Sequence, residues 1–297
     1  MASEPLIEWP QPLMELLGFV GAFLSMGAVG FRLAVLRGRP ETRATTPEER
    51  SVYAQAAQRA ARLGLTGVLI AAVMLATRLP AFAARRHTTI PSLIAGEPQL
   101  ALQIGLLLLA LIGFSLAAGR RPFGWSLAAV GILISPLGGL IGGHLARVVN
   151  PLHVLGGGLW IGTLMQLVVV GIGGTLKSKL SPDRQGAVVA GMVRGFSPLA
   201  LGAFALLAAM GLTTAWRNLK RLDALWSTPY GITLLIKLAV VAGVLALGAH
   251  NWRRLKPTLG GEVAARTLFR SARNELLLGA LVLVITSILV SLPSPGE

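Results

Sequence analysis

The chain contains no cysteine among its 297 residues. Disulfides, Cys-x-x-Cys metal sites and thiolate chemistry are therefore excluded, and a site for a soft metal ion must use methionine and histidine. Charge is scarce as well, because only 13% of the residues are charged. Soluble domains carry about twice that fraction, roughly 25%. The composition therefore points away from a soluble fold.

Long apolar runs take the place of charge. Hydrophobic residues make up 54% of the chain, and its mean hydropathy is +0.69. Runs of roughly 20 apolar residues can cross about 30 Å of hydrocarbon, and backbone groups in lipid must pair internally, as they do in helices. We predict an all-α polytopic membrane bundle, one transmembrane domain over residues 1–297, with about eight spans. The expected spans are 13–36, 61–79, 98–118, 124–143, 151–174, 197–217, 230–251 and 271–292.

Three residue pairs mark expected helix starts. Thr46-Pro47 indicates that the second span begins early, as a cytoplasmic helix, because threonine is a good N-cap and proline suits the first helical position. Asn150-Pro151 and Thr228-Pro229 give the same signal for the fifth and seventh spans.

The net charge of +15 is distributed along the chain in a way that predicts orientation. Arginine and lysine lie at the ends of apolar runs instead of forming one basic face, which argues against nucleic-acid binding. Eighteen of them fall in the loops 37–62, 120–121, 177–194 and 253–273, against seven on the other side, at 78–86, 147 and 217–221. Because basic loops stay cytoplasmic, both termini are predicted outside. The acidic N-terminus lacks the basic region of a signal peptide, so the first run is expected to be a retained span.

Tryptophans and glycines add two further expectations. Trp9, Trp125, Trp216, Trp226 and Trp252 fall at predicted interfaces, as an aromatic belt should, and only Trp160 lies deep within a span. Small-xxx-small patterns, which let helix backbones approach closely, predict tight packing of spans four and five against each other. Their glycines are Gly138, Gly139, Gly142, Gly143, Gly156, Gly157, Gly158 and Gly162.

Two histidines flank the short turn between those spans. His144 ends span four, and His153 lies in the first turn of span five, so both are expected near the outer face. A helix N-terminus favours the neutral imidazole at His153, which keeps a lone pair for a metal ion. The alternative is a pair of interfacial histidines bonded to backbone. Soft thioethers suit Cu(I), and Met14, Met74 and Met210 lie toward the outer ends of their helices, where lipid or core packing is the other explanation.

Lys237 lies about seven residues into span seven. A lysine within a membrane span is costly and is a functional hypothesis by default, although its long side chain can also reach the interface. Glu15 and Asp223 are the candidate partners. His153 and Trp160, seven residues apart, share one helix face, and a site between spans five and seven is geometrically possible. His87 and His250 are weak signals. No phosphate-binding loop and no carboxylate in mid-span reveals an energy source.

Four stretches in the second half of the chain stand out together: GGHLARVVNPLHVLGGGLWIGTL, FSPLALGAFALLAAMGLTTAWRNL, TPYGITLLIKLAVVAGVLALGAHNWRRLKPTL and RSARNELLLGALVLVITSILVSLPSP. In these stretches the chain resembles the copper resistance D (CopD) family of bacterial inner-membrane proteins. The resemblance implies an eight-span protein of the inner membrane that takes copper from the periplasm, often with a periplasmic CopC-like carrier, and places His144 and His153 where the family's histidines lie. Copper uptake toward the cytoplasm, with Cu(I) as the expected ion and no enzymatic activity, is the prediction.

A more distant similarity leaves a second class open. The membrane-bound protoporphyrinogen oxidase family is similar at His153-x6-Trp160 and at the later lysine, Lys237. In that family the pair is associated with b-type haem, which would make the chain a haem-binding membrane oxidoreductase.

Overall fold

The computed structural model describes residues 9–36, 46–140, 147–255, 261–293 and 295. These residues form helices and the segments between them, and they contain no strand. Among the described residues, seven helices are long and apolar enough to cross a membrane, which confirms the all-α polytopic membrane bundle. They cover Gln11–Val35, Pro47–Arg85, Pro98–Ala118, Val149–Leu176, Pro182–Leu219, Pro229–Arg253 and Glu262–Leu289. A shorter apolar helix, Phe123–Ile134, occupies part of the expected span 124–143.

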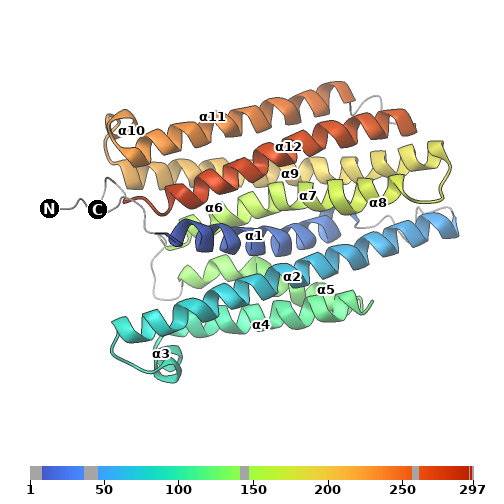
Figure 1. Ribbon diagram of the computed structural model, residues 1–297. Coiled ribbons are helices and arrows are strands. Elements are labelled where there is room, and N and C mark those ends of the chain that lie inside the picture. The colour runs from blue at the N-terminus through green and yellow to red at the C-terminus, as the bar shows by residue number, and fades with distance from the viewer. Residues whose placement is uncertain (1–8, 37–45, 141–146, 256–260, 294, 296–297) are drawn as a thin grey trace.

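Successive long helices run in alternating directions (Figure 1). In chain order the α-helices are α1 (Gln11–Gly30), α2 (Pro47–Arg85), α3 (Ile90–Gly96), α4 (Pro98–Ala118), α5 (Phe123–Ile134), α6 (Val149–Gly157), α7 (Thr163–Gln166), α8 (Gly173–Leu176), α9 (Pro182–Leu219), α10 (Ala224–Ser227), α11 (Pro229–His250) and α12 (Glu262–Leu289). Between and after them lie η1 (Phe31–Val35), η2 (Ser135–Leu140), η4 (Gly158–Gly162), η5 (Leu167–Ile172) and η6 (Asn251–Leu255). The end of the bundle that holds α3 and α10 is called the outer end below, after the predicted orientation, and the end that holds α8 is called the inner end.

Two of the three expected helix starts are confirmed. The Thr46 hydroxyl accepts a hydrogen bond from the Glu49 backbone N–H at 3.3 Å, and Thr228 does the same for Gly231 at 3.0 Å. At the third, α6 begins at Val149 with Val148 as its N-cap. The Asn150 side chain instead accepts a hydrogen bond from the Thr214 hydroxyl of α9 at 2.8 Å, so it joins two helices and caps neither.

The helical segment Val149–Leu176 is the centre of the bundle. In the most apolar 18-residue stretch of this segment, 78% is buried inside the protein, whereas the corresponding share in the other spans is at most 39%. The glycines of this segment meet α1 and α9, while the predicted packing against span four stays a prediction because residues 141–146 lie outside the described residues. A Cβ on Gly162 would lie 2.2 Å from the Phe23 carbonyl oxygen of α1, and one on Gly156 would lie 2.9 Å from the Leu207 nitrogen of α9. Small residues on α1 make this possible, since Gly27 crosses Gly162 at a comparable separation.

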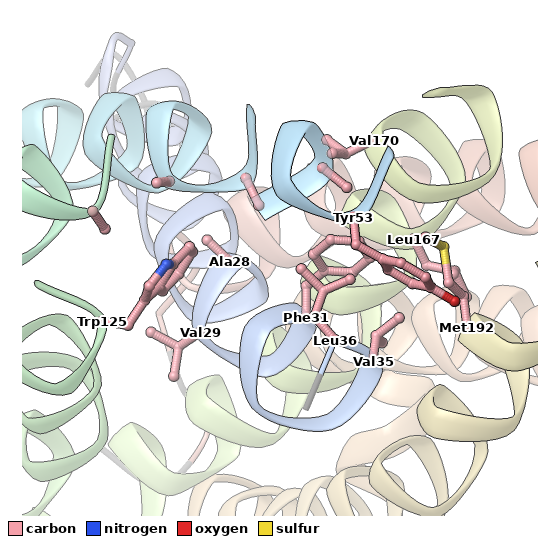
Figure 2. Close-up of a cluster of buried hydrophobic side chains, with 14 of the residues drawn as sticks. Ala28, Val29, Phe31, Val35, Leu36, Tyr53, Trp125, Leu167, Val170 and Met192 are labelled. Carbon is pink, nitrogen blue, oxygen red and sulfur yellow. The ribbon is translucent and has the colours of Figure 1, made fainter. Parts of the chain in front are cut away.

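A buried cluster joins both halves of the chain near the inner end (Figure 2). Phe31 and Leu36 follow α1, Tyr53 comes from α2, and Met192 comes from α9. Lipid tails are as apolar as these side chains, so the cluster is stabilised by close packing rather than by exclusion of water. Trp125 belongs to it, edge-on to Phe114 at 5.9 Å, and is 8% exposed. Trp125 is thus packed inside the protein at the start of α5, whereas the other four tryptophans expected at interfaces are exposed, and the interfacial belt stays a prediction.

Candidate functional site

His153 is held in a defined orientation near the outer end of the central segment. Its Nδ1 lies 2.9 Å from the carbonyl oxygen of Leu207 on α9. A carbonyl oxygen can only accept, so Nδ1 carries the hydrogen and donates it. In the neutral ring this leaves the lone pair of Nε2 free, which is the arrangement that metal-binding histidines use.

The space for this imidazole comes from a glycine one turn further along α9. A Cβ on Gly211 would lie 2.7 Å from Cε1 and 3.1 Å from Nδ1 of His153. Neither Gly211 nor Leu207 was anticipated from the sequence. The only signal was a glycine in an otherwise apolar helix, in AAMGLTTAW, and it does not reveal which side chain fills the gap.

Lys237 lies half-buried on α11, close enough to His153 for the two side chains to interact electrostatically. A site between the fifth and seventh spans at this depth stays a prediction. Among the described residues Lys237 forms no ion pair and no hydrogen bond, so its ammonium has no anionic partner there.

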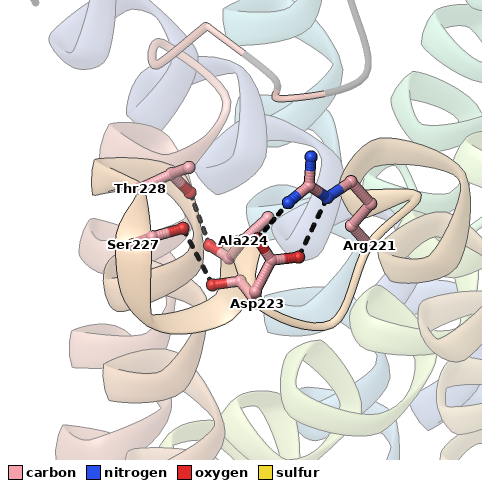
Figure 3. Close-up of polar contacts among 5 residues, drawn as sticks. All are labelled: Arg221, Asp223, Ala224, Ser227 and Thr228. Carbon is pink, nitrogen blue, oxygen red and sulfur yellow. Dashed lines mark hydrogen bonds and ion pairs between the residues drawn. The ribbon is translucent and has the colours of Figure 1, made fainter.

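The partners expected for Lys237 are both engaged elsewhere, which corrects that prediction. Glu15 of α1 pairs with Arg78 of α2 at 2.8 Å. Asp223 receives hydrogen bonds from Arg221 at 3.0 and 2.5 Å in the turn before α10 (Figure 3). The Arg221 guanidinium lowers the pKa of the Asp223 carboxyl, and the same pairing raises the pKa of Arg221. In each case the carboxylate forms an ion pair with a nearby arginine and not with Lys237.

An apolar layer lies on the inner side of His153. Trp160, 6% exposed, stands edge-on to Phe204 of α9 with ring centroids 5.2 Å apart. The same cluster includes Val244 of α11 and Val282 of α12. Trp160 therefore packs between four spans. It lies in η4, where the central segment adopts π-helical geometry. Such π-bulges occur frequently at functional sites.

The remaining predicted ligands are spread over the outer half. Met14, Met74 and Met210 are half-buried on α1, α2 and α9. His144 lies outside the described residues, so the shared His144–His153 site stays a prediction. Within the described ranges, no group of three or more histidine, aspartate or glutamate side chains could hold a metal ion. A copper site there would have to combine His153 with thioethers or with His144.

Sequence reasoning missed a polar network at the inner end. Glu275 of α12 is 5% exposed, and its Oε2 accepts a hydrogen bond from Asn251 Nδ2 at 3.0 Å. Asn251 Oδ1 in turn accepts from the Ser271 hydroxyl at 2.5 Å. The last span was expected to begin at residue 271, which would put Glu275 near one end of the helix and close to the interface. In the structure α12 begins at Glu262, so Glu275 lies in its fourth turn. The Arg-x-Glu-Leu sequence at 273–276 was the available signal.

Gln166 is a second overlooked polar residue. It is fully buried where α7 meets α1, and its Nε2 donates to the Leu24 carbonyl at 3.3 Å. Within the described ranges its Oε1 has no hydrogen-bond partner. A lone polar side chain in a glycine-rich apolar helix was hidden from sequence reasoning because its burial depends on which helix faces it.

Comparison with known proteins bears on the second half of the chain. Residues 190–289, from within α9 to the end of α12, match the model of the copper resistance protein D family. Over 146 residues the chain is 30% identical to the copper transport protein CutJ of Bacillus subtilis (strain 168), an alignment that covers 49% of this chain and 25% of that relative. The chain thus spans about a quarter of the relative's length, and no solved structure matches it.

The matched residues include Gly211 and Lys237 but not His153. They also contain the Asn251–Glu275 pair and three of the seven long apolar helices. The chain is therefore a multi-pass membrane protein whose residues 190–289 are similar to the copper resistance protein D family, as the resemblance in its sequence predicted.

Proposed function

We propose that the protein transports copper across the bacterial inner membrane, from the periplasm toward the cytoplasm, and that it is not an enzyme. His153, together with His144, makes the first contact with the ion at the outer end. The observation that carries the proposal is the His153 imidazole, whose Nδ1 is engaged by Leu207 and whose Nε2 keeps a lone pair. The match of residues 190–289 to a copper family supports the choice of ion.

The ion is proposed to travel as Cu(I), since imidazole and thioether ligands suit this soft cation and cysteine is absent. The layer of Trp160 and Phe204 lies on the inner side of His153, so passage requires these rings to move. Lys237 beside His153 repels a cation. We therefore assign it a gating role, in which the ammonium limits how long copper stays at the outer site.

Copper uptake into vesicles that contain the purified protein tests the proposal. His153→Ala, alone and with His144→Ala, is expected to reduce uptake about tenfold or more, because the substitution removes a direct ligand. The exposed His87, in the turn before α3, supplies the matched control, and His87→Ala should leave uptake unchanged. Uptake that survives the double substitution would remove the histidines from the mechanism.

The proposed orientation places both termini and the histidines in the periplasm, where a CopC-like carrier would deliver copper. The basic asymmetry along the sequence supports it, and so does the position of the start of α1 and the end of α12 at one end of the bundle (Figure 1). A reporter that is active only in the cytoplasm should be silent at Glu297 and active after Pro257. The reverse pattern would place the histidines on the cytoplasmic side and exclude uptake by this route.

A haem-binding oxidoreductase is the second candidate, favoured by one observation. Lys237 has no anionic partner among the described residues and interacts electrostatically with His153. An imidazole with a free Nε2 would hold a haem iron, which would supply electron-transfer chemistry, and Lys237 would bind a propionate as the ammonium or the iron as the neutral amine. The visible spectrum of the solubilised protein separates the candidates. A copper transporter is colourless, and Lys237→Met changes its uptake without changing its spectrum. A stoichiometric Soret band that weakens in Lys237→Met would establish the haem alternative.

A further inference from the structure

A cavity of about 410 Å³ opens at the inner end, between α8 and α12. Its walls include four basic side chains, Lys177, Arg266, Arg270 and Arg273, and two apolar ones, Leu176 and Phe269. It is separate from the proposed copper site at the outer end. This group of residues is called the basic cavity below.

The basic cavity carries a large excess of positive charge. Arg266 is paired with Glu262 in the first turns of α12. Lys177, Arg270 and Arg273 form no ion pair among the described residues. A further arginine comes from α2, because Arg59 Nη1 lies 3.5 Å from the position of a Cβ on Gly174, next to the cavity wall. Among the described residues, the four cations that line the cavity therefore have one ion-pair partner, Glu262, and Arg59 adds a fifth cation nearby.

The same face of α12 continues as an apolar track. Residues 266, 270, 273, 277, 281 and 284 follow one another at intervals of three and four, so their side chains share one side of the helix. Beyond the arginines this side carries Leu277, Leu281 and Val284, which are 63%, 43% and 40% exposed. Val169 of η5, one turn before Gly173, is 56% exposed as well. A cationic end thus leads directly into an uncovered apolar strip.

We propose that the basic cavity binds the headgroup of an anionic phospholipid, whose acyl chain lies along Leu277 and Leu281. A phosphodiester accepts charge-assisted hydrogen bonds from the arginines. Basic pockets between helices at a membrane interface are suited to such headgroups. A free phosphate ion could bind to the basic side chains alone and would gain nothing from the apolar track. Only a lipid has acyl chains that the track can hold, so the track favours a lipid.

Binding of an acyl-labelled phosphatidylglycerol to the purified full-length chain in detergent tests the proposal, with phosphatidylcholine of the same acyl length as the neutral comparison. Phosphatidylglycerol is expected to bind about tenfold more tightly, and Arg270→Gln with Arg273→Gln should abolish that preference. Lys179→Gln with Arg253→Gln removes the same charge from exposed positions near the inner end that do not line the cavity, and should change the affinity less than about twofold.

Two further arms identify the source of the phosphate. Leu277→Asn keeps every cation but interrupts the track, and should weaken phosphatidylglycerol binding severalfold. Inorganic phosphate at millimolar concentration should not displace the lipid. Two results would overturn the proposal. One is an equal loss of phosphatidylglycerol affinity in the two charge variants. The other is displacement of the lipid by phosphate, together with unchanged lipid affinity in Leu277→Asn. Leu277→Asn and the phosphate competition decide the question even if the double arginine variant does not fold.

Discussion

The sharpest test of the outer site is Gly211→Ala. A Cβ at this position would lie 2.7 Å from Cε1 of His153, whereas ordinary contact begins near 3.4 Å, so the imidazole must move by about 0.7 Å. A shift of that size is enough to break the 2.9 Å hydrogen bond between Nδ1 and the Leu207 carbonyl. His153 would then lose the contact that orients its ring.

The expected consequences differ for stability and for copper affinity. Loss of the hydrogen bond costs about 0.5–1.5 kcal/mol, while replacing glycine by alanine within a helix returns about 1 kcal/mol. The unfolding temperature should therefore change little. Loss of a partner that orients a metal-binding histidine lowers metal affinity about 10–100-fold, so we expect Cu(I) affinity to fall at least about tenfold.

The assay is competition for Cu(I) between the purified protein and a colorimetric chelator, together with thermal unfolding. Gly202→Ala is the matched control, because it lies on the same helix and a Cβ there would meet nothing within 4 Å. Its copper affinity should equal that of the unmodified chain. Wild-type affinity in Gly211→Ala, or an equal loss in Gly202→Ala, would refute the role given to the Leu207–His153 contact.

Three other predictions concern the rest of the bundle. Gly27→Ala should destabilise the protein by about 1–3 kcal/mol, because a Cβ would lie 2.2 Å from backbone of the central segment, whereas Gly18→Ala meets nothing and should be neutral in thermal unfolding. Asn251→Ala should cost about 1–3 kcal/mol, because it leaves the buried Glu275 carboxyl without its donor; Glu275→Gln keeps an acceptor and should cost less, and the reverse order in unfolding temperature would contradict the assigned bond. The pKa of Asp223 is lowered from 3.8 in the folded chain, so the stability it contributes is present above that value and is lost as the pH falls through the folded pKa. The unfolding temperatures of Asp223→Asn and the unmodified chain should therefore keep a constant difference from about pH 8 to 5 and converge only below about pH 4.

Much of the architecture follows from properties that each stretch of chain carries alone. An apolar run of about 20 residues must be helical in lipid whatever lies beside it, and the Thr46 and Thr228 caps act on backbone groups three residues away. The unusual lysine in α11 was visible for the same reason, because a cation in an apolar run needs no structural context to be noticed. These features depend on local chemistry, and the sequence by itself determined them.

The site was decided by contacts between distant parts of the chain. The tautomer of His153 depends on the carbonyl of Leu207, 54 residues later, and its space depends on Gly211. The glycines of the central segment meet α1 and α9, since complementary small residues there permit close approach. Glu15 and Asp223 pair with nearby arginines, and Lys237 is left without an anionic partner among the described residues. Helix pairing in a membrane is selected by shape and by the few polar groups that meet, and both are properties of two surfaces together. Only the tertiary structure could therefore determine which residues form the site.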